Sequence, residues 1–251
     1  MARQDHNREY SAETVKMALD FVFDYGPCDI HINNQQEGKT GQWFYTWRTY
    51  NNTKEIAVIL EDYLTVSPYF FSWLKLVHSL YGERSDVSGF ALQGKQIRHS
   101  DSVCCLNISI QHKVFLYSMF GVSGFSPNNK QWLQYIAWSP EHTLKMRGLP
   151  VKKSRHVTAG QKYDQLRWAM EYIQYTRTNK QFTLYSNFKG NKGLAYNWND
   201  GESDSDFKGE GNGTDTDGLL LEWTTDYENL PAIPVYVNTT GVIIKTQVPM
   251  K

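Results

Sequence analysis

The spacing of hydrophobic and polar positions changes sharply near the start of the chain. Residues 1–10 are polar with charges of both signs, which predicts a polar N-terminal arm. Apolar residues then recur at intervals of three and four, which predicts an amphipathic helix over 11–26. Its apolar positions include Val15, Ala18, Leu19, Val22 and Phe23. Because this apolar surface is wider than one buried stripe, we expect a projecting helix that packs on more than one side.

Residues 42–60 predict a β-hairpin whose first strand carries aromatic rings on both faces. The side chains alternate between Trp43, Tyr45 and Trp47 on one face and Phe44, Thr46, Arg48 and Tyr50 on the other. One face is expected to pack in the core, because aromatic side chains bury large apolar areas. The other face suits a contact between proteins and stacking on sugar rings equally well, so both interpretations stay open.

Helical spacing returns twice further along the chain. A helix is predicted from Pro68 to Gly82, with proline at its first position, and another over residues 161–178. Residues 126–140 fit a short helix and a strand equally well, and residues 82–102 predict a loop or a weak edge strand. Short apolar or alternating runs predict the remaining strands. These lie within 28–34, 102–121, 181–188 and 219–225 and in two proline-bounded segments near the C-terminal end.

These elements indicate a fold class and a domain organisation. Short turns between strands favour antiparallel pairing, and the helices do not alternate regularly with the strands. We therefore predict an α+β fold: an antiparallel β-sandwich flanked by helices, with an amphipathic helix leading at the N-terminus. No linker rich in proline, glycine or serine divides the chain, so residues 11–251 are expected to form one domain. Within it, 11–26 are the projecting helix and 28–251 are the β-sandwich core with its helices.

Composition narrows the class of protein. The chain has 251 residues with 26 basic and 26 acidic side chains, and 14% of its residues are aromatic. Because there is no basic surplus, we expect no specific binding of nucleic acid. A net charge of zero also removes the repulsion that keeps copies of a protein apart, which favours self-association.

Three cysteines, two of them adjacent, do not make a disulfide framework. The first residues contain no apolar core typical of a signal peptide, and no apolar run is as long as a membrane span. The sequence therefore predicts a protein of the reducing cytoplasm with no membrane partner.

The sequence contains no motif with the residue spacing of a known catalytic site. The seven histidines are scattered without zinc-binding spacing, and no glycine-rich phosphate loop or serine-nucleophile motif occurs in a suitable context. The acidic loop 199–218 fails the calcium-binding pattern, because Gly213 and Thr224 stand where acidic ligands are needed. We therefore predict no catalytic residue, no metal site and no required cofactor. An enzyme whose site converges from distant residues is a competing interpretation.

Four segments resemble the polyhedrins of the cypoviruses, which are insect viruses whose occlusion bodies are protein crystals. They are "ARQDHNREY", "SAETVKMALDFVFDYG", "WFYTWRTYNNTKEIAVIL" and "SPYFFSWLKLVHSLYG". The resemblance covers most of the chain in size and order of elements. It implies trimers that pack into a crystal lattice around virus particles in the cytoplasm of infected cells, with the N-terminal helix reaching neighbouring trimers. Some family members hold nucleoside triphosphates, so a bound nucleotide is a further implication, with no residue here assigned to it.

The predicted function is a structural matrix protein that assembles into crystalline occlusion bodies, with itself and virus particles as partners. The predicted assembly contacts are Tyr10, Val15, Leu19, Val22, Phe23, Trp43, Tyr45, Trp47 and Tyr50. Tyrosine ionises near pH 10, and burial raises its pKa further, so tyrosines buried at contacts would disrupt the lattice only in alkali. Tyr10, Tyr45 and Tyr50 are the candidates for this release. The competing function is a carbohydrate-binding module that uses the aromatic residues 43–50.

Overall fold

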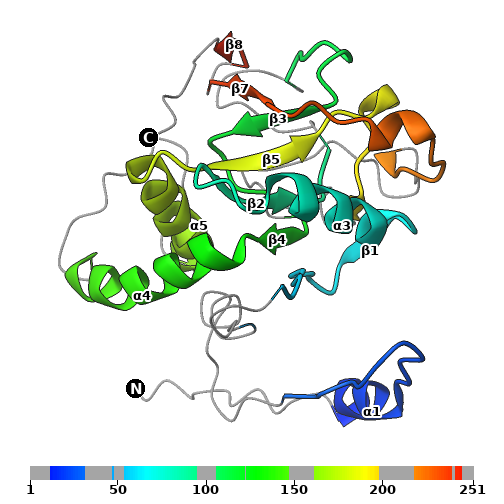
Figure 1. Cartoon of the computed structure of the whole chain (residues 1–251). Coiled ribbons are helices and arrows are strands. Elements are labelled where there is room, and N and C mark those ends of the chain that lie inside the picture. The colour runs from blue at the N-terminus through cyan, green and yellow to red at the C-terminus, as the bar shows by residue number, and fades with distance from the viewer. Residues whose placement is uncertain are drawn as a thin grey trace. The chain divides into compact units, whose positions relative to one another are not determined.

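The computed structural model in Figure 1 divides the chain into two compact units at Gly38 and Lys39. The structure describes residues 12–31, 47, 54–94, 106–121, 123–146, 161–197, 218–238 and 241–244. In the first unit, helix α1 (Ala12–Asp20) is followed by turns and extended residues up to His31. The strand predicted within 28–34 is therefore wrong over residues 28–31.

Helix α1 is shorter than predicted. It ends at Asp20, whose carboxylate is unfavourable at the negative end of the helix dipole. The backbone N–H of Phe21 donates to the carbonyl of Ala18 at 3.3 Å, a tight turn that closes the helix. The aromatic and β-branched residues that follow are poorer helix formers than alanine or leucine. As a result, Val22 and Phe23 lie beyond the helix.

The second unit is built on a six-stranded sheet in the order β4-β2-β5-β3-β7-β8. Its strands are β2 (Val87–Ala91), β3 (Val114–Tyr117), β4 (Phe125–Pro127), β5 (Phe182–Ser186), β7 (Val235–Val237) and β8 (Ile243–Ile244). Pairing is antiparallel between β2 and β4, β3 and β5, and β7 and β8. It is parallel between β2 and β5 and between β3 and β7. A separate antiparallel sheet pairs β1 (Leu64–Val66) with β6 (Ala195–Asn197).

The helices and the two sheets confirm the predicted α+β class. The main sheet is mixed, whereas only antiparallel pairing was predicted. A parallel pair needs a long crossover connection. The chain between β2 and β5, which includes helices α4 and α5, provides one. Turn signals between neighbouring strands carry no information about such long-range pairing.

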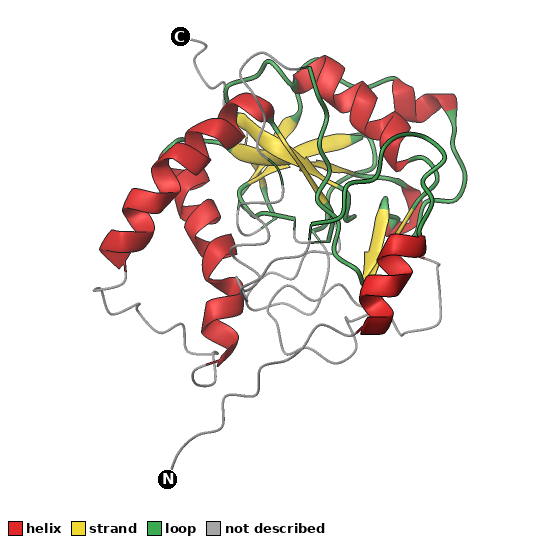
Figure 2. Cartoon of the chain, turned by 90° about the horizontal axis from the view of Figure 1, so that it is seen from below, coloured by secondary structure: helices red, strands yellow, loops and turns green. Residues whose placement is uncertain are grey.

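Among the described residues of the second unit, the longer helices pack beside the main sheet (Figure 2). They are α3 (Phe70–Tyr81), α4 (Asn129–Met146) and α5 (Gln161–Thr178), and the described part also has the short 3₁₀ helices η1 (Lys189–Asn191) and η4 (Thr225–Glu228). Helix α5 has the bounds that the sequence predicted. Helix α3 begins two residues after Pro68, and α4 shows that residues 129–140 are helical.

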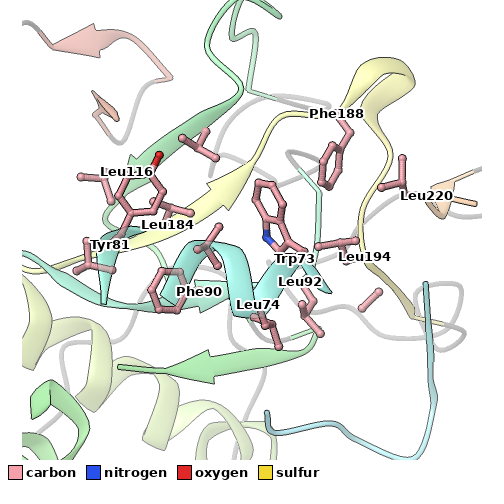
Figure 3. Close-up of a cluster of buried hydrophobic side chains, with 14 of the residues drawn as sticks. Trp73, Leu74, Tyr81, Phe90, Leu92, Leu116, Leu184, Phe188, Leu194 and Leu220 are labelled. Atoms are coloured by element: carbon pink, nitrogen blue, oxygen red, sulfur yellow. The ribbon is translucent and has the colours of Figure 1, made fainter. Parts of the chain in front are cut away.

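Side chains on opposite faces of the main sheet form separate parts of the core. On one face, Leu116 of β3 and Leu184 of β5 pack with Trp73 of α3 (Figure 3). On the other face, Phe115 and Tyr185 belong to a cluster with residues before β3. This separation follows from strand geometry, since successive side chains point to opposite faces. A third cluster gathers aromatic rings of α4 and α5 around Phe125 of β4.

Several predicted strands differ from the structure. Residues 82–102 contain β2, which is an interior strand and not an edge, and every one of its residues is buried. Residues 106–109 and 220–224 form no strand. The hairpin predicted over 42–60 lies mostly outside the described residues, and its described part has a single bridge. There, Ile59 and Phe125 exchange two backbone hydrogen bonds of 2.8 and 3.1 Å along the free edge of β4.

We predict that Gly89→Ala strongly destabilises the second unit. A methyl group at Gly89 would lie 2.2 Å from a ring carbon of Phe125 and 2.7 Å from the carbonyl oxygen of Ser126. Overpacking of this kind costs about 1–3 kcal/mol of unfolding free energy, measurable by urea denaturation. In the control Gly218→Ala, the nearest atom is a ring carbon of Tyr196 at 3.4 Å, an ordinary contact. Equal stability of the two variants would contradict the pairing of β2 with β4.

Candidate functional site

A run of exposed apolar side chains covers the end of α1 and the residues after it. We call residues 17–25 the apolar segment. Its exposed large side chains are Met17, Leu19, Phe21, Val22, Phe23 and Tyr25. Leu19 is 64% exposed and Val22 is 77% exposed. Exposed apolar side chains that follow one another in this way make the segment a candidate interaction site, because soluble domains seldom leave large apolar surfaces open to water.

The predicted assembly contacts are divided between this segment and other places. Leu19, Val22 and Phe23 lie in the apolar segment and are exposed, whereas Val15 on α1 is half-buried. Trp47 is half-buried and packs against the aromatic cluster of α4 and α5. Its backbone carbonyl accepts a hydrogen bond of 3.4 Å from the indole of Trp132. The remaining four predicted contacts lie outside the described residues: Tyr10, Trp43, Tyr45 and Tyr50.

Tyrosines are buried on the face of the main sheet that lies away from α3. Tyr135 of α4 and Tyr172 of α5 meet edge to face with ring centroids 4.8 Å apart, and the hydroxyl of Tyr172 donates to the carbonyl of Ser88 at 3.2 Å. On the same face, the hydroxyl of Tyr185 donates to the carbonyl of Met119 at 3.1 Å. Burial raises the pKa of all three phenols well above the ordinary value. These side chains are therefore uncharged at neutral pH, and ionising them requires strong alkali.

A polar cluster joins the start of β2 to β7. The guanidinium of Arg84 donates from Nε and Nη2 to the two carboxylate oxygens of Asp86 at 3.0 and 2.8 Å. The hydroxyl of Tyr236 also donates to Asp86 Oδ2. We call Arg84, Asp86 and Tyr236 the Asp86 cluster. Beside it, the hydroxyl of Tyr81 donates to the carbonyl of Pro231 at 2.6 Å, which ties the end of α3 to the segment before β7.

The protonation states in this cluster depend on one another. Burial opposes ionisation of Asp86, but hydrogen bonds from Arg84 and Tyr236 outweigh it and keep the carboxyl pKa below its ordinary value. Burial and the Asp86 carboxylate together raise the pKa of Tyr236 to about 12. Burial likewise raises the pKa of Tyr81 to about 12, although the charge of Arg84 opposes the shift. Alkali would therefore place a phenolate beside the Asp86 carboxylate, where the two charges repel.

The sequence analysis missed the Asp86 cluster. Arg84 and Asp86 are two residues apart, but Tyr236 is separated from Asp86 by 150 positions. No spacing along the chain signals such a contact, because it exists only after β7 has paired beside β3.

His78 and Ser126 form a second contact between titratable and nucleophilic groups, at 2.7 Å from Nε2 to Oγ. The hydroxyl of Ser126 donates to the carbonyl of Ala57 at 2.5 Å, so its single proton is already used. The His78 ring must therefore donate to Ser126, the reverse of the direction that activates a serine nucleophile. Burial lowers the pKa of His78 to about 4, which keeps the ring neutral. This pair serves packing between α3 and β4.

Comparisons with known protein families and with curated proteins return no match to this chain. In the described part of the chain, no group of three or more histidine, cysteine, aspartate or glutamate side chains is arranged to hold a metal ion. Among the described helices, none combines the length and the apolar content needed to cross a membrane.

We predict that Tyr236→Phe flattens the loss of stability in alkali. The folded pKa of Tyr236 is raised, so its stabilising contribution is complete below about pH 10 and is lost as the pH rises from there through about 12. The variant should be less stable at pH 8 by about 1.5–3 kcal/mol, because a hydrogen bond to a charged group is lost. Between pH 10 and 12, the unfolding free energy of the variant should fall less steeply with pH than that of the parent chain. The difference in slope should correspond to about one bound proton.

The matched control is Val235→Ala on the same strand, which removes apolar contacts but no titrating group. Urea denaturation of this control should show lower stability at every pH with an unchanged slope. If the unfolding free energy of Tyr236→Phe fell with pH as steeply as that of the parent chain, ionisation of Tyr236 would not contribute to alkaline unfolding.

Proposed function

We propose that this chain is a structural matrix protein that assembles into crystalline bodies, encloses virus particles in the cytoplasm of infected cells, and dissolves in alkali. The observation that carries the proposal is the apolar segment, residues 17–25, whose large side chains are exposed. Burying one such side chain against another molecule contributes about 1.5–3 kcal/mol before the cost of association. Several of them on each copy supply the driving force for self-assembly.

Two further properties support the proposal. The net charge of zero lets copies approach without long-range repulsion. The resemblance to cypovirus polyhedrins implies the type of assembly, which is a trimer that packs into a lattice. It also implies that the N-terminal helix contacts neighbouring trimers. The proposed matrix requires no cofactor, because its function is mechanical protection.

The buried tyrosines support release in alkali. A matrix that protects its contents must persist at neutral pH and then dissolve under one defined condition. Tyr172 and Tyr185 are buried as neutral phenols on the face of the sheet away from α3, and Tyr236 pairs with a carboxylate. Each of these phenols is held in its neutral form by the folded protein, so its ionisation in alkali lowers the free energy of unfolding. In this proposal, alkali weakens the subunits themselves as well as the contacts between them.

We predict that Leu19→Glu combined with Val22→Glu abolishes body formation. Carboxylates in the apolar segment cannot be buried against another copy without a large desolvation cost. The full chain, expressed in insect cells, should remain soluble where the parent chain forms faceted bodies visible by light microscopy. Thermal unfolding of the second unit should be unchanged. The control Lys16→Gln with Asp24→Asn alters exposed polar side chains of the same region and should leave the bodies intact.

Normal bodies from the Leu19/Val22 variant would contradict the proposed role of the apolar segment. A parent chain that stays monomeric under all conditions would contradict the matrix function itself. In that case the aromatic residues 43–50 should be tested for binding to oligosaccharides.

We predict that turbid suspensions of the bodies are stable at neutral pH and clear sharply above about pH 10, where tyrosine begins to ionise. Replacement of Tyr10, Tyr45 and Tyr50 by phenylalanine should raise the pH of clearing, measured by light scattering. An unchanged clearing pH would exclude these three tyrosines as the release groups. Clearing below about pH 9 would contradict release by tyrosine altogether.

A further inference from the structure

Three half-buried aromatic rings lie in contact on the surface of the second unit, at the start of α3. We call Tyr69, Trp223 and Tyr227 the aromatic row. The ring centroids of Tyr69 and Trp223 are 5.5 Å apart, and those of Trp223 and Tyr227 are 5.6 Å apart. Ile110, which is 47% exposed, borders the same small hollow as Tyr227 and extends the apolar surface. Partly covered tryptophan and tyrosine side chains are typical of surfaces that bind another protein.

Charged side chains of opposite sign stand at different places along the aromatic row. Lys189 borders the small hollow at the Tyr227 end, is exposed, and makes no ion pair within the described residues. Lys113 lies nearby, but its ammonium pairs with the Asp226 carboxylate at 2.6 Å. Beside the indole of the row, Glu228 accepts a hydrogen bond of 2.9 Å from the ring N–H, and the exposed Glu222 precedes the indole in the chain. A partner that complements this surface is therefore apolar, with an acidic and a basic end.

The apolar segment of another copy has these properties. Its exposed large side chains include three aromatic rings, which can pack edge to face on the rings of the row. The charged residues within the segment are Asp20 and Asp24, and both are exposed without an ion pair among the described residues. Lys16 stands before the segment and is exposed as well. The acidic side chains suit Lys189, and the basic one suits the carboxylates beside the indole, so the charges favour one direction of binding.

We propose that the apolar segment of one copy binds the aromatic row of another copy. This inference rests on the proposed matrix function and adds the surface that receives the segment. The segment and the row are different surfaces, so the contact is heterologous, and each copy can give one segment and receive another. Contacts of this type build rings or extended assemblies, whereas a contact between two identical surfaces ends at a pair.

Two full-chain variants, each defective in one half of the contact, test the proposal. Leu19→Glu with Val22→Glu blocks the segment and leaves the row intact. Ile110→Glu with Lys189→Glu blocks the row and leaves the segment intact, because a carboxylate resists burial in an apolar contact. Each variant alone should stay monomeric in sedimentation velocity experiments. A mixture of the two should form a complex of one copy of each, which grows no further because both remaining surfaces are blocked.

The matched control is Leu60→Glu with Lys130→Glu, which changes one exposed apolar residue and one exposed lysine elsewhere on the second unit. This control should form bodies like the parent chain. Normal bodies from the Ile110/Lys189 variant, or no complex in the mixture, would overturn the proposed surface and leave the matrix function standing. The mixture needs no bodies, so a complex formed by variants of a parent chain that makes none would contradict the matrix function alone.

Reversal of charge tests the direction of binding. Asp20→Lys with Asp24→Lys, added to the Ile110/Lys189 variant, should weaken the complex by about tenfold, because attraction to Lys189 of the other copy becomes repulsion. Lys189→Glu in the Leu19/Val22 variant should then restore the affinity to within about threefold. Thermal unfolding should be the same for all these chains, since the changed residues are exposed. If the second reversal gave no recovery, the placement of the acidic side chains beside Lys189 would be wrong.

Discussion

The second unit depends on the hydrogen bonding of β5 along both of its edges. This strand, Phe182–Ser186, pairs in parallel with β2 and antiparallel with β3, and so joins three distant parts of the chain. Its Leu184 faces the cluster under α3, whereas Tyr185 faces the opposite cluster. The backbone N–H of Phe182 also donates to the carbonyl of Asp86 at 2.8 Å. Displacing β5 would leave its backbone groups unpaired and open the core on both faces at once.

The two units contribute different properties to one molecule. The second unit has a well-packed core whose phenols are held neutral by burial. The first unit contains the apolar segment, which has little apolar packing of its own. In the proposed matrix, different residues would therefore provide the cohesion between copies and the resistance of each copy to pH. Substitutions can alter one property without the other, which makes the two roles experimentally separable.

Local patterns predicted the helices better than the sheet. The spacing of apolar residues over 70–81 and 161–178 reflects a helix period that is independent of what the helix packs against. Strand β2 was predicted only as a loop or a weak edge strand, because Ser88 and Gly89 interrupt its apolar run. The small size of Gly89 is explained only in the structure, where Phe125 packs closely against it. Parallel pairing and the Asp86 cluster depend on contacts between distant segments, which spacing along the chain does not record.

Leu19, Val22 and Phe23 are exposed, and their role as assembly contacts stays a prediction. Val22 and Phe23 were chosen because they continue a helical stripe, yet α1 ends before them. Both side chains are exposed among the described residues. A helical period alone does not predict this exposure, because it does not show whether other segments pack on the helix.

The bridge between Ile59 and Phe125 has a consequence for how copies of this chain can associate. An open sheet edge is a template for adding strands from other molecules, and repeated addition leads to amyloid-like fibres. Ile59 occupies the backbone groups of Phe125 on the outer side of β4, and the opposite edge strand, β8, has two residues. Over the described residues, both edges of the main sheet thus offer little backbone for strand addition. In the proposed matrix, copies would therefore associate through side-chain contacts, whose geometry permits ordered packing instead of fibre growth.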